Sequence, residues 1–327
     1  MTWSDDNIIF LVSLPRAGST LLQRILSSHS KIHSTAESWL LLPLFHSTRS
    51  GNVFSEFGHT HAATAINDFT SSLPDGKSTY YKEIQRMAVR LFEKATPKNK
   101  LYYLEKTPRN ALIIDDLINT FPNSKFIFLW RNPLACASSM IDTFGKGKWN
   151  LFKYTVDLYD GIDCMIKATE KHHDRIIQIN YENLLINPTN TINTLLQQLN
   201  LNETSSLIEQ FQDVNFEGHM GDPTGIKKYS TLSAEPLNKW KQTLRTPTRI
   251  LWAKRYIKWL GEDRLHTMGY DINELQKEIN HIKPSTNYLA SDLVRMSYGT
   301  LERTLQLKLF RHIIRTRHTR EFNRRLF

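Results

Sequence analysis

The sequence predicts an α/β fold with a central, mainly parallel sheet, and three observations support this class. Short apolar segments rich in β-branched residues alternate with segments of helical period. The chain has 327 residues, enough for one large domain or two small ones. Apolar residues make up 40% and charged residues 23%, as in ordinary globular proteins. We expect one domain over residues 1–270 and a basic, helical C-terminal extension over 271–327.

The elements follow in order from the N-terminus. Residues 8–12 (IIFLV) form a continuous apolar run, which is typical of a strand buried inside a parallel sheet. A glycine-containing turn leads into a helix over residues 20–28, where apolar positions recur with helical period. Residues 51–100 and 190–265 have mostly helical patterns. The same patterns predict strands at 101–105, 125–130 and 176–179, and helices at 111–120, 134–141 and 154–171.

Composition excludes several classes of protein. The two cysteines, Cys136 and Cys164, are too few for a disulfide framework or a cysteine-rich metal site, and they fit a reducing compartment. No apolar run approaches the ~20 residues that a membrane-spanning helix needs. The first six residues carry two acidic and no basic side chains, which is the wrong charge for a secretory signal. The expected location is therefore cytoplasmic.

The positive charge is concentrated at the C-terminus. The net charge is +10, and residues 301–327 hold eight basic and two acidic side chains, a balance of +6. An apolar stripe on a helix is predicted there, because apolar residues recur every fourth position at Leu301, Leu305, Leu309 and Ile313. We interpret this helix as docked on the domain. The alternatives are a peripheral helix on the inner membrane surface and a partner contact. No nucleic-acid recognition motif is present, so we expect no nucleic-acid partner.

The turn after the first strand has the features of an anion site. Between a parallel strand and a helix N-terminus, free backbone N–H groups and the helix dipole both favour a negatively charged ligand. A glycine allows close approach of the backbone, hydroxyls add donors, and an arginine adds a forked positive charge. The general nucleotide loop G-x-x-x-x-G-K-[ST] does not match, which argues against an ATP or GTP site of that type. The candidate binding residues are Arg16, Ala17, Gly18, Ser19 and Thr20.

A second basic element follows the strand at 125–130. Arg131 comes directly after the strand, at the edge where open α/β sheets bind ligands. Ser139 lies eight residues later, on the predicted helix. Together these two side chains can clamp a second phosphate group.

With both elements present, the sequence resembles the sulfotransferases that use 3′-phosphoadenosine 5′-phosphosulfate (PAPS). The branch it resembles most includes tyrosylprotein sulfotransferases and bacterial carbohydrate and small-molecule sulfotransferases. The resemblance implies a P-loop-like three-layer sandwich, PAPS as sulfonate donor, and 3′-phosphoadenosine 5′-phosphate (PAP) as product. It covers most of residues 7–270 and rests on the loop at 15–20, Arg131 with Ser139, and the segments at 29–37, 105–108 and 181–184.

The resemblance also implies catalytic roles. Glu37 matches the general base of the tyrosylprotein branch, and Lys106 matches the lysine that stabilises charge on the bridging oxygen. Arg16 is expected to share this charge stabilisation. His29 and His33 are the alternative bases, because cytosolic sulfotransferases use histidine, but their positions do not match that pattern.

Three further residues are placed by the resemblance on the nucleotide side. Tyr181 is expected to contact the nucleotide, with a core aromatic as the alternative. Lys239 is expected to reach toward the 3′-phosphate. Thr224 stands near the position where the tyrosylprotein branch has a transition-state serine, and we assign it no role.

The chemistry needs no metal if cationic side chains neutralise the transferred group, and we expect none. The acceptor is expected to be a hydroxyl-bearing molecule: a carbohydrate, a lipid-linked intermediate, a small alcohol or a peptide tyrosine. Two other functions remain as alternatives. One is a nucleotide-dependent phosphotransferase with an atypical loop, which Mg²⁺-dependent ATP turnover would support. The other is a non-catalytic nucleotide-binding protein, which the presence of both Glu37 and Lys106 argues against.

Overall fold

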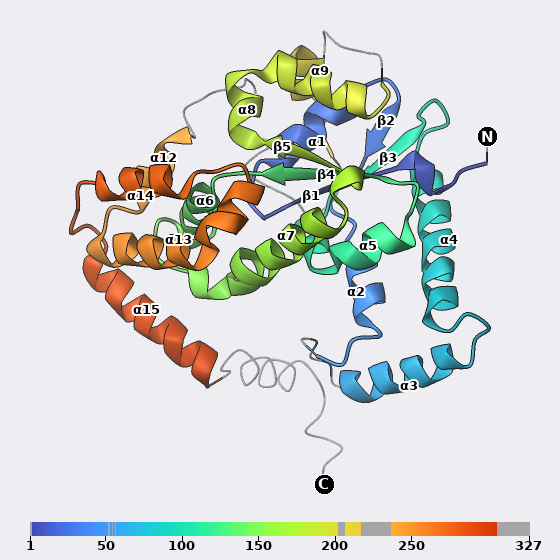
Figure 1. The fold of residues 1–327 in the computed structure, drawn as a ribbon, viewed down its shortest axis with the longest axis horizontal. Helices are drawn as coiled ribbons and strands as arrows, with labels where there is room; N and C mark the ends of the chain where they lie inside the picture. The colour runs from blue at the N-terminus through green and yellow to red at the C-terminus, as the bar shows by residue number, and fades with distance from the viewer. Residues whose placement is uncertain are drawn as a thin grey trace, which may run out of the picture.

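The computed structural model describes residues 2–51, 53, 55, 57–201, 207–216 and 237–305 (Figure 1). Five parallel strands form a single sheet in the order β2-β3-β1-β4-β5. The chain moves from β1 toward one edge and later crosses to the other side of β1, so the sheet has its topological switch point there. The strands are β1 (Ile8–Ser13), β2 (Ile32–Ser34), β3 (Tyr102–Glu105), β4 (Lys125–Trp130) and β5 (Ile176–Asn180).

Helices cover both faces of the sheet and make a three-layer α/β sandwich (Figure 1). One face packs against α1 (Ser19–Ser27), α8 (Tyr181–Ile186), α9 (Pro188–Gln198) and α10 (Leu207–Gln210). The core on the opposite face includes residues of α2 (Leu41–His46), α4 (Lys77–Ala95), α5 (Ile114–Thr120), α6 (Pro133–Gly145), α7 (Ile162–Lys171), α12 (Lys239–Thr243), α13 (Pro247–Thr267) and α14 (Ile272–Asn280). The other long helices are α3 (His59–Ser71) and α15 (Leu289–Thr304).

Strand β1 shows why the sequence pattern here is continuous rather than alternating. Ile8, Phe10 and Val12 belong to the core on one face, and Ile9 and Leu11 belong to the core on the other. Because side chains alternate along a strand, a strand covered on both sides must be apolar at every position. The predicted strands at 8–12, 101–105, 125–130 and 176–179 correspond to β1, β3, β4 and β5.

The structure differs from the predicted elements at three places. Strand β2 was not predicted, because three residues including His33 and Ser34 give no readable period. The helix expected at 111–120 begins with a 3₁₀ segment, Pro108–Ile113, and becomes α-helical only in α5. The helix expected at 154–171 contains a π-helical segment, Val156–Gly161, before α7.

The C-terminal helices pack closely on the rest of the molecule. Leu275 and Ile279 of α14 share a buried cluster with Phe10 of β1, and α13 packs against α14 and α15. The division near residue 270 stays a prediction. The part of the predicted tail after Leu305, including Leu309 and Ile313, lies outside the described residues. No described helix combines the length and the hydropathy that crossing a bilayer requires.

Candidate active site

The candidate site residues gather at the carboxyl ends of β1, β3 and β4. Ser13, Glu105 and Trp130 are the last residues of these three strands, which are neighbours in the sheet. Since the strands are parallel, the loops that follow them meet at one edge. This arrangement brings together the segments predicted separately from the sequence.

The loop after β1 has the backbone that anion binding needs. Arg16 and Gly18 both have positive φ, 69° and 95°, so the chain turns sharply before α1 begins at Ser19. Gly18 occupies the N-cap position of α1 and provides no side chain to cap the helix. The first N–H groups of a helix have no partners within that helix, and they face the same edge of the sheet as the loop.

Both the positive φ of residue 18 and the neighbouring Tyr181 ring favour glycine at this position. A Cβ at position 18 would lie 2.3 Å from two carbon atoms of the Tyr181 ring. Tyr181 is fully buried, and the Arg131 guanidinium lies 4.4 Å from the centre of its ring. Tyr181 is therefore a core aromatic residue that contacts both the loop after β1, at Gly18, and the Arg131 guanidinium.

Arg131, Arg16 and Ser139 form one connected group. Arg131 Nη1 donates to the Arg16 carbonyl at 2.8 Å, and Arg16 Nε donates to Ser139 Oγ at 3.2 Å. Arg131 is only 8% exposed, and its Nε has no hydrogen-bond partner among the described residues. A buried guanidinium N–H without a partner is costly, and an anionic ligand at this edge would satisfy it.

The loop that carries Arg131 is held by a residue to which the sequence analysis gave no role. Glu182 accepts hydrogen bonds from the Asn132 backbone N–H at 3.0 Å and from the Tyr270 hydroxyl at 2.6 Å. Burial beside Glu182 raises the pKa of Tyr270, which therefore stays protonated as a donor. The start of α6 adds local support, because Asn132 caps the helix by accepting from the Leu134 N–H. In the sequence, Glu182 belongs to the segment 181–184 on which the resemblance rests, but no role of its own was assigned to it.

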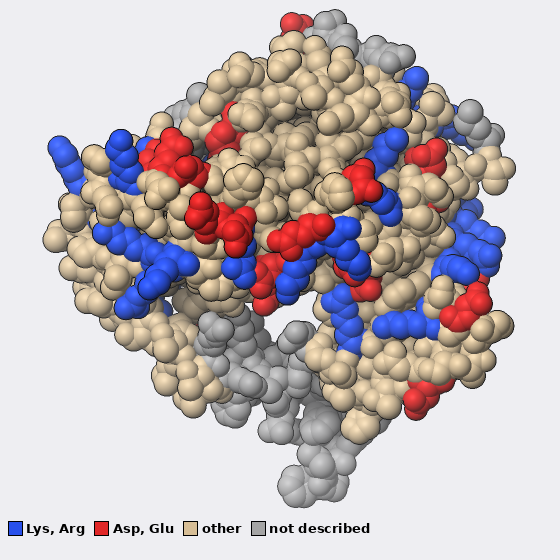
Figure 2. Space-filling view, in the orientation of Figure 1, with Lys and Arg blue, Asp and Glu red and all other residues tan. Residues whose placement is uncertain are grey.

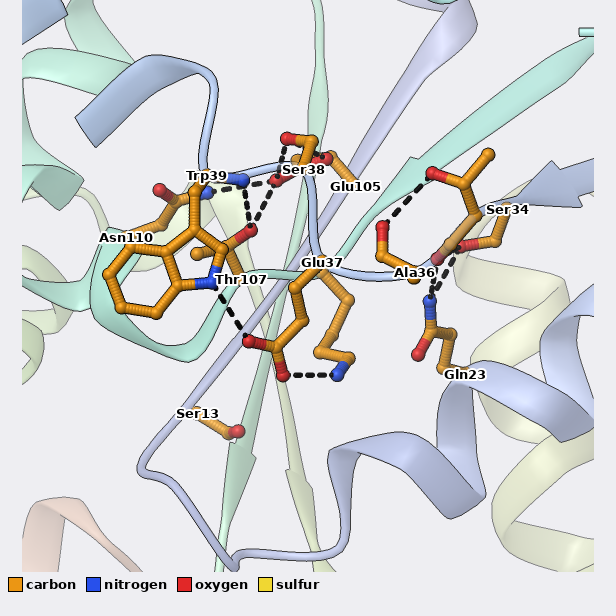
Figure 3. Close-up of polar contacts among 12 residues, drawn as sticks. Ser13, Gln23, Ser34, Ala36, Glu37, Ser38, Trp39, Glu105, Thr107 and Asn110 are labelled. Atoms are coloured by element: carbon orange, nitrogen blue, oxygen red, sulfur yellow. Dashed lines mark hydrogen bonds and ion pairs between the residues drawn. The ribbon is translucent and has the colours of Figure 1, made fainter. Parts of the chain in front are cut away.

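Glu37 and Lys106 form a direct ion pair (Figure 3). Lys106 Nζ lies 2.8 Å from Glu37 Oε1, and their side chains are 3% and 12% exposed. The second carboxylate oxygen, Oε2, accepts from the Trp39 indole N–H at 3.1 Å. In the view of Figure 3 the Glu37 carboxylate extends away from Glu105 and toward Ser13, the end of β1. The predicted base and the predicted cation are therefore held together by tertiary structure.

Glu105 anchors the segment that carries Glu37. Its buried carboxylate accepts from Ser38 Oγ at 3.0 Å, from Thr107 Oγ1 at 2.7 Å and from Asn110 Nδ2 at 3.4 Å. Burial raises the pKa of Glu105, while the hydrogen bonds from Thr107 and Ser38 oppose that rise. Ser38 and Thr107 are the sequence neighbours of Glu37 and Lys106. The sequence pattern did not indicate that both would donate hydrogen bonds to Glu105.

A second brace ties this segment to α1. Gln23 Nε2 donates to Ser34 Oγ at 2.7 Å and to the Thr35 carbonyl at 2.8 Å (Figure 3). Gln23 is 1% exposed, so these bonds are shielded from water. The end of β2, and with it the Glu37 segment, is thereby coupled to the helix that begins at the anion loop.

Trp39 occupies a strained position beside the ion pair. Its φ of 52° lies in the left-handed region, which bulky residues rarely adopt. The Arg109 guanidinium lies 5.7 Å from the centre of its ring and makes two hydrogen bonds, at 3.0 and 3.1 Å, to the buried Asp157. These bonds raise the pKa of Arg109. Asp157 therefore holds the Arg109 guanidinium over the Trp39 indole, whose N–H donates to Glu37.

The other predicted residues take varied positions. Lys239, on α12, is largely exposed and lies 3.5 Å from Asp142, one turn beyond Ser139 on α6. His33 is the middle residue of β2, with its ring centre 6.2 Å from that of Tyr103. His29 lies before β2, at the opposite edge of the sheet.

Thr224 lies outside the described residues. Within the described part of the chain, no group of three His, Cys, Asp or Glu residues is placed to hold a metal ion. Cys136 is fully buried, and burial raises the pKa of its thiol to about 12.

Comparisons with solved structures show the same fold. The sulfotransferase domain from the curacin biosynthetic pathway superposes with a TM-score of 0.53 at 23% identity, over 81% of this chain and 98% of that domain. The sulfotransferase domain of the Synechococcus PCC 7002 olefin synthase gives a TM-score of 0.50 at 21% identity, over 80% of this chain and 93% of that domain.

Comparisons with curated sequences point the same way. Nodulation protein NoeE of Sinorhizobium fredii is 25% identical over 296 residues, which are 81% of this chain and 66% of that protein. Protein-tyrosine sulfotransferase 1 of Danio rerio is 23% identical over 254 residues, 72% of this chain and 66% of that protein. A family model described as "Sulfotransferase family" matches residues 8–205. Because that match covers more than half of the chain, this protein belongs to the sulfotransferase family.

Proposed function

We propose that this protein transfers the sulfonate group of PAPS to a hydroxyl acceptor, with Glu37 as the general base. The observation that carries the proposal is the Glu37–Lys106 ion pair at the sheet edge that also holds the Arg16–Arg131 group. One carboxylate and several cations at one edge supply both functions that sulfonate transfer requires: removal of a proton and stabilisation of negative charge.

The donor side is assigned to the loop after β1 and to the start of α6. The loop backbone of residues 16–20, with the N-terminus of α1, would hold the 5′-phosphosulfate, and Arg131 with Ser139 would hold the 3′-phosphate. The unsatisfied Nε of Arg131 and the positive φ angles of Arg16 and Gly18, which turn the loop backbone at the start of α1, support this fit. Tyr181 would support the nucleotide from below the loop, and Lys239 would approach from α12. When bound, PAPS supplies the activated sulfonate.

The acceptor side is assigned to Glu37. Its carboxylate would take the proton of the acceptor hydroxyl as the acceptor oxygen bonds to sulfur. The bond between sulfur and the bridging oxygen breaks, and PAP is the leaving group. Lys106 would stabilise the negative charge that develops on the bridging oxygen, with Arg16 assisting. Trp39 and Lys106 already fix both oxygens of Glu37, so the base needs little reorganisation before it acts.

The acceptor class is proposed only as a hydroxyl-bearing molecule. The names of the relatives include a nodulation protein and protein-tyrosine sulfotransferases, which differ from one another in kind. A carbohydrate, a lipid-linked intermediate, a small alcohol and a peptide tyrosine are all consistent with a carboxylate base and a cationic donor site.

Calorimetric titration with PAP tests the donor site. We expect wild-type protein to bind PAP with micromolar or tighter affinity, and Arg131→Ala to weaken binding about tenfold or more, because it removes a charge-assisted phosphate contact. Asp115, an exposed residue near the other end of the sheet, provides a control as Asp115→Asn with unchanged affinity. Absence of PAP binding to wild type would contradict the proposal, and turnover of ATP with Mg²⁺ would favour a phosphotransferase. Transfer from labelled PAPS to a panel of the four acceptor classes then tests the reaction itself.

A further inference from the structure

Helix α15 docks on the domain through a charged face. Asp292 is fully buried, and its carboxylate pairs with Arg249 of α13 at 2.6 Å, where Arg249 is 2% exposed. Glu302, on the same helix, is also buried. Gly299 fits closely against Phe152, since a Cβ there would lie 2.7 Å from that side chain. The inner face of α15 is therefore held in a fixed orientation.

The outer face of α15 is apolar. Leu293, Val294, Leu301 and Leu305 are 53%, 70%, 51% and 58% exposed. A helix on a water-soluble protein normally turns its apolar side inward and its charged side outward. The order is reversed in α15, and Figure 2 shows its surface in the lower left without a band of charge. An exposed apolar patch of this kind marks a surface that contacts another protein or a membrane.

A groove extends this apolar surface between α15 and α13. It has a volume of about 410 Å³ and is lined mainly by aromatic and aliphatic side chains. Leu251, half exposed, lies on its wall, and Thr300 and Thr304 bring the groove to the side of α15 next to Leu301. The main apolar lining residues are Trp149, Phe152, Trp252 and Met296.

Basic side chains border the groove. Lys254, Arg255 and Lys258 are exposed on α13, and Arg255 also lines the groove. Lys and Arg side chains gather over α13, beside α15, in Figure 2. The sequence that follows Leu305 adds seven more basic residues and one acidic residue. A partner that is both apolar and negatively charged matches this surface in hydropathy and in charge.

We propose that the outer face of α15 and the α13–α15 groove form a membrane-binding surface that rests on anionic lipid. Apolar side chains and the groove would enter the acyl boundary, and the lysines and arginines of α13 would contact the lipid headgroups. This proposal places the contact on a helix fixed to the domain by the Arg249–Asp292 pair. Binding would hold the enzyme at a membrane surface, where a lipid-linked acceptor would be presented.

Flotation of the full-length protein with lipid vesicles tests the surface. The vesicles are pure phosphatidylcholine, or phosphatidylcholine mixed with phosphatidylglycerol. We expect binding to the mixed vesicles that weakens as salt is raised. Val294→Glu combined with Leu301→Glu should lower the partition coefficient about tenfold or more, because two apolar side chains are replaced by charges that lipid repels. Ile186→Glu on α8 is the control, because Ile186 is an aliphatic residue whose exposed fraction, 59%, lies between those of Leu301 and Val294. This variant should bind vesicles like wild type.

Three results would overturn the proposal. The first is wild-type protein that stays unbound to the mixed vesicles. The second is a double variant that binds as well as wild type, which would assign binding to charge alone. The third is a double variant that melts at a clearly lower temperature than Ile186→Glu without lipid, or that converts a wild-type dimer to a monomer. Either form of the third result would mean that protein covers this face. PAP titration of the same variants separates this outcome from any failure of the donor site.

Discussion

The Lys106 ammonium lies 2.8 Å from the Glu37 carboxylate, although the two residues are 69 positions apart in the chain. Lys106 follows the end of β3, and Glu37 lies three residues after β2, its neighbour in the sheet. Both side chains are largely buried, so their charges are poorly screened and each depends on the other. The proposed base and the proposed electrophilic cation therefore form a single unit.

Replacement of Glu37 tests its role as base. We expect Glu37→Gln to lower kcat about 10²–10⁴-fold, since the amide cannot accept the acceptor proton, while PAP affinity changes little. Transfer from labelled PAPS and PAP calorimetry measure the two effects. His33→Gln is the control for the alternative base and should keep wild-type activity, because His33 lies within β2. Loss of activity in His33→Gln with retained activity in Glu37→Gln would reverse the assignment.

Trp39 is expected to position Glu37 rather than to react. Trp39→Phe keeps an aromatic ring against Arg109 but removes the indole N–H that donates to Glu37 Oε2. We expect kcat to fall about tenfold with KM for PAPS unchanged, as one hydrogen bond to a charged group is lost. Steady-state kinetics in PAPS measure this split. A rise in KM for PAPS at constant kcat would show that Trp39 acts on the donor instead.

The contact between Gly18 and Tyr181 predicts a coupled pair. Gly18→Ala should destabilise the protein by about 2 kcal/mol or more, because φ is positive and the new Cβ overlaps the Tyr181 ring. Tyr181→Ala alone should also destabilise, by leaving a cavity. In the double variant the overlap is relieved, so the loss should be smaller than the sum of the two. Urea unfolding of all four proteins gives the coupling, and strict additivity would contradict the close contact.

Glu105 predicts a pH dependence of stability. Burial raises its pKa in the folded state, so the folded protein binds this proton more tightly than the unfolded chain does. The contribution of Glu105 to the free energy of unfolding therefore decreases as the pH rises from the ordinary glutamate pKa toward the raised pKa of the folded state. Glu105→Gln lacks this ionisation. The stability of wild type relative to Glu105→Gln should thus fall as pH rises through that window, measured by urea unfolding at several pH values. A constant difference would show that Glu105 has the same pKa in both states.

The Arg249–Asp292 pair predicts how α15 is attached. Asp292→Asn leaves the charge of Arg249 buried without its counter-ion and should cost about 3–5 kcal/mol of unfolding free energy. Arg249→Met with Asp292→Leu removes both charges and should recover much of that loss. Thermal unfolding followed by circular dichroism compares the variants. Equal stability of the single and double variants would mean that the uncompensated charge of Arg249 does not cause the loss, and wild-type stability of Asp292→Asn would mean that the pair contributes little to docking.

The fold class, and the position of the loops that we propose to bind the donor, could be predicted from the sequence alone. Runs such as residues 8–12 are apolar at every position because both sheet faces are covered, so the parallel sheet was predictable. Arg16, Gly18 and Arg131 stand in the segments that follow β1 and β4, and the carboxyl ends of parallel strands meet at one edge. Their meeting was therefore expected without coordinates, and their roles in catalysis remain proposals.

The side chains that support the site, and the residues that α15 exposes, became known only from the packing of the folded chain. Gln23, Ser38, Thr107 and Glu182 act through hydrogen bonds to residues distant in sequence or in other elements, and such contacts have no period to detect. The tail pattern predicted an apolar stripe but not its direction. A helix stripe can face inward or outward; of this one, Leu301 and Leu305 lie in the described residues and are exposed, whereas Asp292 of α15 is buried against Arg249. The local sequence pattern determines the secondary structure of each segment, whereas packing between segments determines which residues each side chain contacts.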